Sequence, residues 1–268
     1  MTGAQRFTGR TVLVTGSTGM AGSAARAIAA EGGSVLVVSR TPANAQALAE
    51  AIGADGGTAA WFAADVSHEE EVEAAFDACV TRFGRIDAVY GAAGISARRF
   101  GDGPLHEASL EGWETVMAAN ARSQFLVCRA AVRRMLEQEP DAHGSRGALL
   151  TMSSTLASHP VPAHFSTHAY AASKGAIDAF TRAVAAYYAP NGIRVNAIAP
   201  SLVATPMSQR AQEDPAIVAY LARKQPLAGG PIDADAVTDA ALFLLSDDAR
   251  MITGQVIAVD GGWSVSEG

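Results

Sequence analysis

The sequence predicts an α/β fold with a doubly wound, mainly parallel sheet and helices on both faces. Short apolar or β-branched runs alternate with helical patterns along the whole chain of 268 residues. The first run enters a glycine-rich turn that opens a helix, which is typical of a nucleotide-binding unit. Because no repeat, linker or low-complexity tract interrupts the alternation, we expect one domain over residues 1–268.

In the first half of the chain, each expected strand ends in small or polar residues. A helix is expected after the glycine-rich turn, running to about residue 31, and another over 42–52. A third begins at a capping box, Ser67 to Glu70, and ends at Arg82, before Gly84. The expected strands are 11–15, 34–38, 58–64 and 86–90.

The second half continues the same alternation. Residues 109–138 have a mostly helical pattern that contains Asn120, and a long helix containing Tyr170 runs to about residue 188. Residues 205–224 are helical but broken by two prolines. A helix over 233–245 is capped by its first residue, an aspartate. The expected strands are 148–152, 193–198 and 255–259.

Composition narrows the class of protein. The net charge is −7 and no basic face is evident, so we expect no nucleic-acid partner. Residues 1–10 lack an apolar signal core, and no apolar run approaches the ~20 residues of a membrane span. Cys79 and Cys128 form no Cys-x-x-Cys motif and are interpreted as core residues in a reducing compartment. We therefore expect a cytoplasmic protein without a membrane partner.

Two side chains near residue 170 have the spacing of a catalytic pair. Tyr170 and Lys174 are four residues apart, which puts them on one face of a helix. A nearby ammonium favours the phenolate, and lowering a tyrosine pKa from ~10 to ~7 takes about 4 kcal/mol. Such a tyrosine exchanges protons at neutral pH. The alternative is an amphipathic helix with a half-exposed lysine.

The chain from about Thr11 to Trp263 resembles the short-chain dehydrogenase/reductase family. The signatures occur in the family's order, and together they are highly specific. They are the Thr15-Gly16 turn, Asp65-Val66, Ala93-Gly94, Asn120, Ser154, Tyr170 with Lys174, Asn196-x-x-x-Pro200, and the Asp260-Gly-Gly tail. The resemblance implies a Rossmann-like fold and a homotetramer or dimer formed through the long helices containing Asn120 and Tyr170.

The resemblance also implies roles for individual residues. Tyr170 would be the general acid/base, Ser154 would hydrogen-bond the substrate oxygen, Lys174 would hold the nicotinamide ribose and lower the Tyr170 pKa, and Asn120 would position a water. No metal site is implied. The implied cofactor-binding residues are Gly16, Ser17, Thr18, Gly19, Met20, Ala21, Ser39, Arg40, Asp65, Val66, Ala92, Ala93, Gly94, Tyr170, Lys174, Pro200, Ser201 and Val203.

Several positions depart from the family's pattern. Met20 stands where a glycine is commonest, and Gly19 precedes it. The family's Asn-Asn-Ala-Gly segment is Gly91-Ala92-Ala93-Gly94 here, which we expect to loosen side-chain hydrogen bonds around the fourth strand. Ser201 replaces the glycine of a Pro-Gly pair, and the loop between Ser154 and Tyr170 is longer than usual.

These features favour an NAD(P)-dependent oxidoreductase that interconverts a carbonyl and a secondary alcohol. The alternative is a non-catalytic, nucleotide-binding member of the same fold, such as a redox sensor or scaffold. Met20 and the absence of the family's asparagines at positions 91 and 92 favour this alternative slightly, whereas the intact set of four predicted catalytic residues argues against it. A metal enzyme is less well supported, because His159, His164 and His168 have mixed spacing and no cysteine or glutamate partner.

The end of the second expected strand predicts NADP as the cofactor, with NAD as the other possibility. Enzymes that prefer NAD usually place an acid there to bind the ribose hydroxyls. Ser39 removes that charge, and Arg40 can contact a 2′-phosphate. The alternative is that Arg40 stacks on the adenine or points into water.

The sequence does not identify the small-molecule substrate. We expect specificity to come from segments 98–105, 155–167 and 201–224, and we hypothesise that His164 or His168 lines the pocket.

Overall fold

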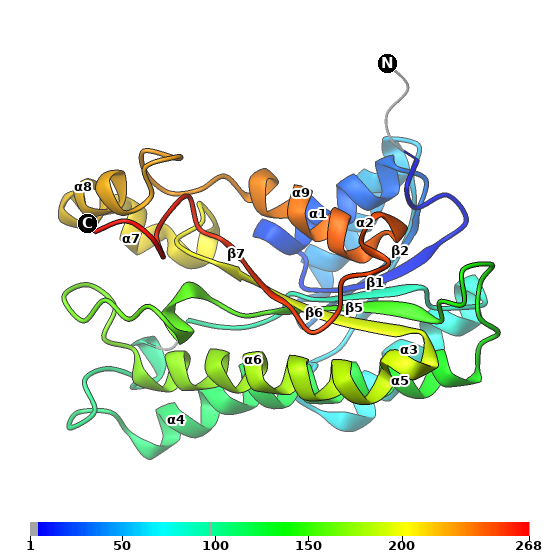
Figure 1. The fold of residues 1–268 in the computed structure, drawn as a ribbon, viewed down its shortest axis with the longest axis horizontal. Helices are drawn as coiled ribbons and strands as arrows, with labels where there is room; N and C mark the ends of the chain where they lie inside the picture. Colours follow the sequence, from blue (N-terminus) through cyan, green and yellow to red (C-terminus); the bar gives the residue numbers. More distant parts are fainter. Residues whose placement is uncertain (1–4, 97, 268) are drawn as a thin grey trace.

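The computed structural model describes residues 5–96 and 98–267, in which seven strands form one parallel sheet between two layers of helices (Figure 1). The spatial order is β3-β2-β1-β4-β5-β6-β7, so the direction of winding reverses between β1 and β4. This confirms the predicted doubly wound, Rossmann-like fold. The strands are β1 (Thr11–Thr15), β2 (Ser34–Ser39), β3 (Thr58–Ala63), β4 (Ala88–Gly91), β5 (Gly147–Met152), β6 (Ile193–Pro200) and β7 (Val256–Val259).

Helices cover both faces of this sheet and bury an apolar core on each side. One face carries α1 (Gly19–Ala30), α2 (Pro42–Ala54) and α9 (Ala234–Leu245). The other carries α3 (Glu69–Phe83), α4 (Leu110–Val116), α5 (Ser123–Glu137) and α6 (His168–Tyr188). The short helices α7 (Gln209–Glu213) and α8 (Pro215–Lys224) follow β6 and stand at the end of the sheet where its strands finish (Figure 1).

Two expected helices differ in detail from the structure. The helix expected over 109–138 is α4 and α5 joined by a π-helical segment, Met117–Arg122, which contains Asn120. A π turn holds an extra residue and often marks a functional site. The capping box expected at Ser67 is wrong: α3 begins at Glu69, and the Ser67 hydroxyl donates instead to Asp65 Oδ1 at 2.7 Å.

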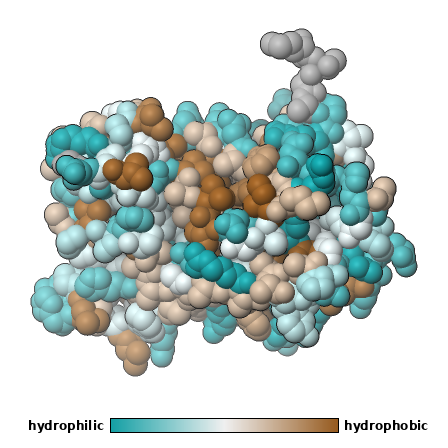
Figure 2. Space-filling view, in the orientation of Figure 1, coloured by the Kyte–Doolittle hydropathy of each residue, from teal (hydrophilic) through white to brown (hydrophobic). Residues whose placement is uncertain are grey.

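Apolar side chains are exposed where β7 forms one edge of the sheet. Figure 2 shows them gathered across the middle of the face on which Figure 1 places β7 and α9. Ile257 of β7 is 36% exposed and Phe243 of α9 is 39% exposed. None of the described helices combines the length and apolar character needed to cross a membrane.

A buried carboxylate ties β1 to β4 at the opposite end of the sheet from α7 and α8. Asp87 Oδ2 accepts from Thr11 N at 2.8 Å, and its Oδ1 accepts from Arg85 Nε at 2.7 Å and from Arg10 Nη1 at 3.5 Å. Asp87 is 6% exposed. The hydrogen bonds therefore satisfy a charge that would otherwise be costly to bury.

We predict that Asp87→Ala lowers the free energy of unfolding by about 1–3 kcal/mol, because it leaves the Thr11 N–H without its partner. Urea denaturation monitored by circular dichroism measures the change. The exposed Glu139→Ala is the control and should leave the midpoint where it is. A wild-type midpoint for Asp87→Ala would contradict the prediction.

Candidate active site

A cavity of about 580 Å³ opens where β4, β5 and β6 end. Most of the residues that line it come from the three segments expected to set specificity and from the predicted cofactor positions. Among the candidate site residues, its lining includes Met20, Arg40, Gly94, Ser154, Tyr170, Ser201 and Val203. This is the position that the fold predicts for a ligand, at the carboxyl edge of the sheet.

Helix α6 carries both Tyr170, which lines this cavity, and Lys174, which is buried one turn further along the helix and is not among the lining residues. Lys174 is 3% exposed, and its Nζ donates to the Met152 carbonyl at the end of β5 at 2.8 Å. The same Nζ lies 5.4 Å from the centroid of the Tyr170 ring. Ser154 follows β5 directly and interacts with the Tyr170 hydroxyl, while its Oγ lies 3.4 Å from the Pro200 carbonyl. The ends of β5 and β6 thus hold Ser154 beside Tyr170.

Asn120 reaches the same place from the π-helical segment. Its Oδ1 accepts from Ile95 N at 2.8 Å, and its Nδ2 donates to Ser173 Oγ at 3.1 Å. Gly94 lies between this amide and the lysine: a Cβ added there would be 2.9 Å from Asn120 Oδ1 and 3.7 Å from Lys174 Nζ. Only a glycine fits this junction without displacing one of the two side chains.

Burial shifts the pKa of both titrating groups. It lowers the pKa of Lys174 to about 8, partly opposed by the negative charge of Asp178. Burial also raises the pKa of Tyr170, partly opposed by the hydrogen bond with Ser154. The pKa of Tyr170 is therefore raised overall and not lowered as expected, because desolvation of the phenolate outweighs the hydrogen bond with Ser154.

The N-terminus of α6 is fixed by an acid that the sequence analysis did not identify. Asp102 is 6% exposed, and its two carboxylate oxygens accept from Ala169 N at 3.0 Å and from Tyr170 N at 2.9 Å. A carboxylate at a helix N-terminus also complements the helix dipole. Because Asp102 lies in a polar loop far from α6 in sequence, no local sequence motif predicts the contact.

The glycine-rich turn between β1 and α1 has the conformation of a ligand cradle. Gly16 has φ +101°, and a Cβ there would lie 2.9 Å from Ala21 Cβ. Thr18 is the residue before α1, and its side chain makes no capping hydrogen bond. The N–H groups in the first turn of α1 are therefore available to an anion. Met20 packs against the core and lines the cavity.

Polar groups meet where β2 and β3 end. Ser39 Oγ accepts from Ser17 Oγ at 3.0 Å, and Arg40 Nη1 is 3.6 Å from Asp65 Oδ2. The Arg40 side chain is 66% exposed. Burial acts to raise the pKa of Asp65, but hydrogen bonds from Ser67 and the charge of Arg40 lower it overall. Val66, next in the chain, packs against the core.

The substituted segment after β4 is not loosened as expected. Gln124 Nε2, from α5, donates to the Gly91 carbonyl at 2.7 Å, and a Cβ on Gly91 would overlap the Gln124 amide. Ala93 N donates to Thr15 Oγ1 at 3.1 Å. Gln124 therefore occupies space that an asparagine at position 91 would need. Ala92 packs against the core between these two anchored residues.

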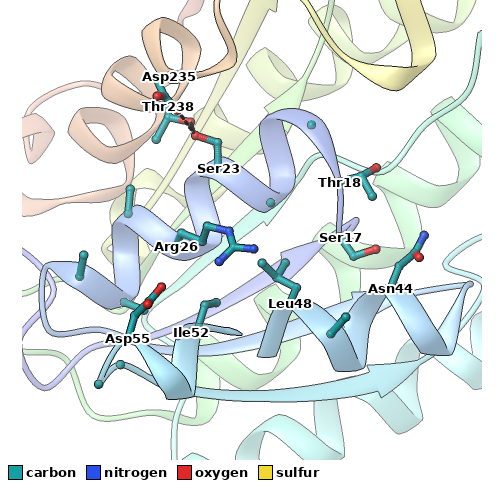
Figure 3. Close-up of a pocket in the computed structure, with 18 of the residues that line it drawn as sticks. Ser17, Thr18, Ser23, Arg26, Asn44, Leu48, Ile52, Asp55, Asp235 and Thr238 are labelled. Carbon is teal, nitrogen blue, oxygen red and sulfur yellow. Dashed lines mark hydrogen bonds between the residues drawn. The ribbon is translucent and has the colours of Figure 1, made fainter. Parts of the chain in front are cut away.

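A larger hollow, of about 1000 Å³, lies between α1, α2 and α9, and the catalytic candidates are not among its lining residues (Figure 3). Ser17 and Thr18 lie at one end of it and Asp55 at the other. Ser23 bridges α1 to α9 by donating to Asp235 Oδ1 at 2.6 Å. Only the end formed by Ser17, Thr18 and Gly19 belongs to the candidate cofactor turn.

The hypothesis that His164 or His168 lines the substrate pocket is wrong. Neither is among the lining residues: the His164 ring packs against Tyr220, with centroids 4.8 Å apart, and His168 is exposed at the start of α6. Within residues 5–96 and 98–267, no group of three or more His, Cys, Asp or Glu side chains is arranged to hold a metal ion.

Comparisons with known proteins agree with this geometry. A family model described as enoyl-(acyl carrier protein) reductase matches residues 14–264. The chain is similar to D-threitol dehydrogenase of Mycolicibacterium smegmatis, with 34% identity over 97% of this chain and 95% of that protein. It is 37% identical to 3beta-hydroxysteroid dehydrogenase 1 of Eggerthella lenta, over 97% and 95% of the two chains.

A solved structure extends the likeness to three dimensions. The crystal structure of a gluconate 5-dehydrogenase from Burkholderia cenocepacia, in complex with NADP and tartrate, superposes with a TM-score of 0.87. The two sequences are 30% identical over 97% of each chain.

The lowered Lys174 pKa predicts a specific dependence of stability on pH. Folding lowers this pKa from 10.5 to about 8. Between pH 8 and pH 10.5 the unfolded chain therefore binds more protons at this lysine than the folded chain does. The lysine's contribution to the free energy of unfolding thus rises with pH in this range. The difference in unfolding free energy, wild type minus Lys174→Met, should therefore grow from pH 8 to pH 10. Urea titrations at each pH measure it, and a constant or shrinking difference would contradict the assignment.

Proposed function

The chain belongs to the short-chain dehydrogenase/reductase family, and from this premise we propose that it is a nicotinamide-dependent oxidoreductase acting on a secondary alcohol and the corresponding carbonyl compound. One observation carries the proposal: Ser154 and Tyr170 line the same cavity at the carboxyl edge of the sheet, next to a buried lysine. Two hydroxyl donors at one point suit an oxygen that gains negative charge during reaction.

The residues present fit a nicotinamide dinucleotide. Gly16 and Gly94 leave room where a Cβ would collide, and Ser201 Oγ is buried at the cavity without a partner among the described residues. We assign the pyrophosphate to the turn from Gly16 to Ala21, and the nicotinamide ribose to Tyr170 and Lys174. The bound cofactor supplies a hydride acceptor or donor.

The protein's own groups handle the proton. Tyr170 gives its hydroxyl proton to the substrate oxygen during reduction and takes it back during oxidation. Ser154 donates a hydrogen bond to the same oxygen as its charge develops. With a pKa of about 8, Lys174 is mainly an ammonium at neutral pH, and its charge stabilises the phenolate that Tyr170 becomes. Asn120 secures the loop after β4 through both of its bonds to Ile95.

The non-catalytic alternative has less support. An inactive nucleotide-binding protein needs the turn between β1 and α1 but has no need of Ser154 and Tyr170 together. Met20, one of the departures that favoured the alternative, packs against the core without closing the cavity. Gln124 holds the segment whose asparagines are lost.

For the cofactor, we propose a preference for NADP(H) over NAD(H). The related gluconate 5-dehydrogenase was solved with NADP. In this chain, β2 ends in Ser39, which brings no negative charge to the ribose. Arg40 lines the cavity, and its exposed side chain lies near Asp65, so its guanidinium is available to bind a 2′-phosphate.

Three further features complete the proposal. We propose that the whole chain forms one domain. We also propose that it self-associates into a dimer or tetramer that covers the apolar surface around Ile257 and Phe243 (Figure 2). The exposed Phe125 on α5 supports a second contact through the long helices. The free, buried Cys79 and Cys128 support a cytoplasmic location.

The first test is catalytic. Tyr170→Phe removes the proton donor, so kcat should fall at least about 100-fold while the Kd of the cofactor stays nearly unchanged. The assay follows nicotinamide absorbance with a panel containing threitol, a 3β-hydroxysteroid and gluconate. Tyr187→Phe, on the same helix but 74% exposed, is the matched control. The proposed acid would be wrong if Tyr170→Phe kept more than about a tenth of wild-type turnover.

The second test concerns the cofactor. Ser39→Asp combined with Arg40→Ala replaces a possible phosphate contact with a repulsive carboxylate, so the Kd ratio of NADPH to NADH should shift by at least about 100-fold toward NADH. Fluorescence titration of each reduced cofactor measures both constants, and the Arg133→Ala variant on α5 serves as the control. Tighter binding of NADH by the wild type would reject the preference and leave the oxidoreductase assignment standing.

A further inference from the structure

The cavity that contains Ser154 and Tyr170 combines an apolar lining with arginines. Its apolar side chains include Ile95, Leu156, Phe165, Leu202, Met207 and Trp263. Besides Arg40, which is assigned above to the cofactor, three arginines line it, Arg98 and Arg99 from the segment after β4 and Arg210 from α7. No aspartate or glutamate is among the described lining residues. The lining of the cavity is therefore positively charged, whereas the chain as a whole has a net charge of −7.

Within the part of the chain that the structure describes, Arg98, Arg99 and Arg210 have no acidic partner, in contrast to the arginines of the protein that form ion pairs. Arg10, Arg40 and Arg134, for example, each lie within 4 Å of at least one carboxylate. The ion pairs found among residues 5–96 and 98–267 include none made by Arg98, Arg99 or Arg210. Their guanidinium donors are therefore available to an anion from outside the chain.

Two of the three are oriented by contacts at the cavity's rim. Arg98 Nη2 donates to the His164 carbonyl at 3.0 Å, which links the segment after β4 to the loop before α6. The Arg99 guanidinium carbon lies 4.7 Å from the centroid of the Phe100 ring. Both residues are exposed, and these contacts, one to a neutral acceptor and one to an aromatic face, leave their charges without a counter-ion among the described residues.

One buried polar atom in the lining is an independent sign of a ligand. Trp263 is 1% exposed and lines this cavity, yet its Nε1 has no hydrogen-bond partner among the described residues. Leaving a buried donor unpaired is unfavourable, and a bound molecule with an acceptor atom would relieve this.

We propose that the substrate is a carboxylate: a secondary alcohol or ketone with an apolar body whose acid group is bound by Arg98, Arg99 and Arg210. The inference rests on the proposed function and deepens it. The hydroxyl or keto oxygen lies at Ser154 and Tyr170, the apolar body packs on Leu156, Phe165 and Trp263, and the carboxylate stays unchanged through the redox step. A monoanion suits this apolar cavity better than a phosphate dianion, because less charge must be desolvated.

Matched substrates test the proposal. We would compare 3-hydroxycyclohexanecarboxylate with 3-hydroxycyclohexanecarboxamide, which share a shape and differ in charge. The carboxylate should have a kcat/KM at least about 10-fold higher, mainly through a lower KM, because a hydrogen bond from a guanidinium to a carboxylate is stronger than one to a neutral amide. This advantage should shrink as salt is raised. Equal kcat/KM values for the two substrates would overturn the proposal.

Variants locate the effect. In the combined Arg98→Gln and Arg210→Gln protein, kcat/KM for the carboxylate should fall at least about 10-fold more than kcat/KM for the carboxamide, so that the preference between the two is lost. Replacing both arginines with lysine should restore part of the preference, because the charge returns without the bidentate geometry. Arg82→Gln, on α3 and away from the cavity, is the control. An undiminished preference in the glutamine variant would overturn the assignment of the arginines.

A binding measurement separates this inference from the proposed function. Calorimetry of the NADP-loaded protein with cyclohexanecarboxylate and cyclohexanecarboxamide needs no turnover. Binding of the carboxylate that is lost in the glutamine variant supports the anion site, even if no alcohol is oxidised and the proposed function fails. Carboxylate binding that is absent, or no tighter than that of the carboxamide, rejects the anion site even if neutral alcohols are oxidised.

Discussion

The burial of one ammonium group constrains the architecture of the site. Lys174 is 3% exposed, and a buried cation is tolerated only where neighbouring groups replace its lost water. The Met152 carbonyl does so at the end of β5, which requires α6 to lie against that strand in one position. The same placement puts Tyr170 one helical turn away, beside Ser154. The position of α6 on the sheet therefore also fixes the geometry of the two candidate catalytic hydroxyls.

Much of this could be predicted from the sequence, because the signals are local. Apolar runs, glycines and prolines placed the strands and helices close to their observed positions, and the spacing of Tyr170 and Lys174 predicted that they share a helix face. The candidate residues also meet at one edge of the sheet, as a parallel fold requires.

The features that could not be predicted depend on partners far apart in the chain. Asp102 caps a helix that begins 66 residues later (position 168), and Gln124 fills the space beside Gly91 from another layer of the fold. The π-helical turn at Asn120 has no marker in composition or periodicity. The Tyr170 pKa was misjudged for a related reason: spacing reveals the nearby charge but not the depth of burial, which has the larger effect.

The π-helical turn also limits how this region can change length. An α-helix rotates about 100° per residue, so removing one residue from Met117–Arg122 would rotate α5 by that angle relative to α4. Gln124 would then leave Gly91, and the face of α5 packed on the sheet would turn toward solvent. Point substitutions on the exposed side of α4 and α5 leave the rotation of α5 relative to α4 unchanged, whereas the insertion or deletion of one residue alters it. Between Trp113 and Gln124, the number of residues is thus more tightly fixed than the identity of most of them.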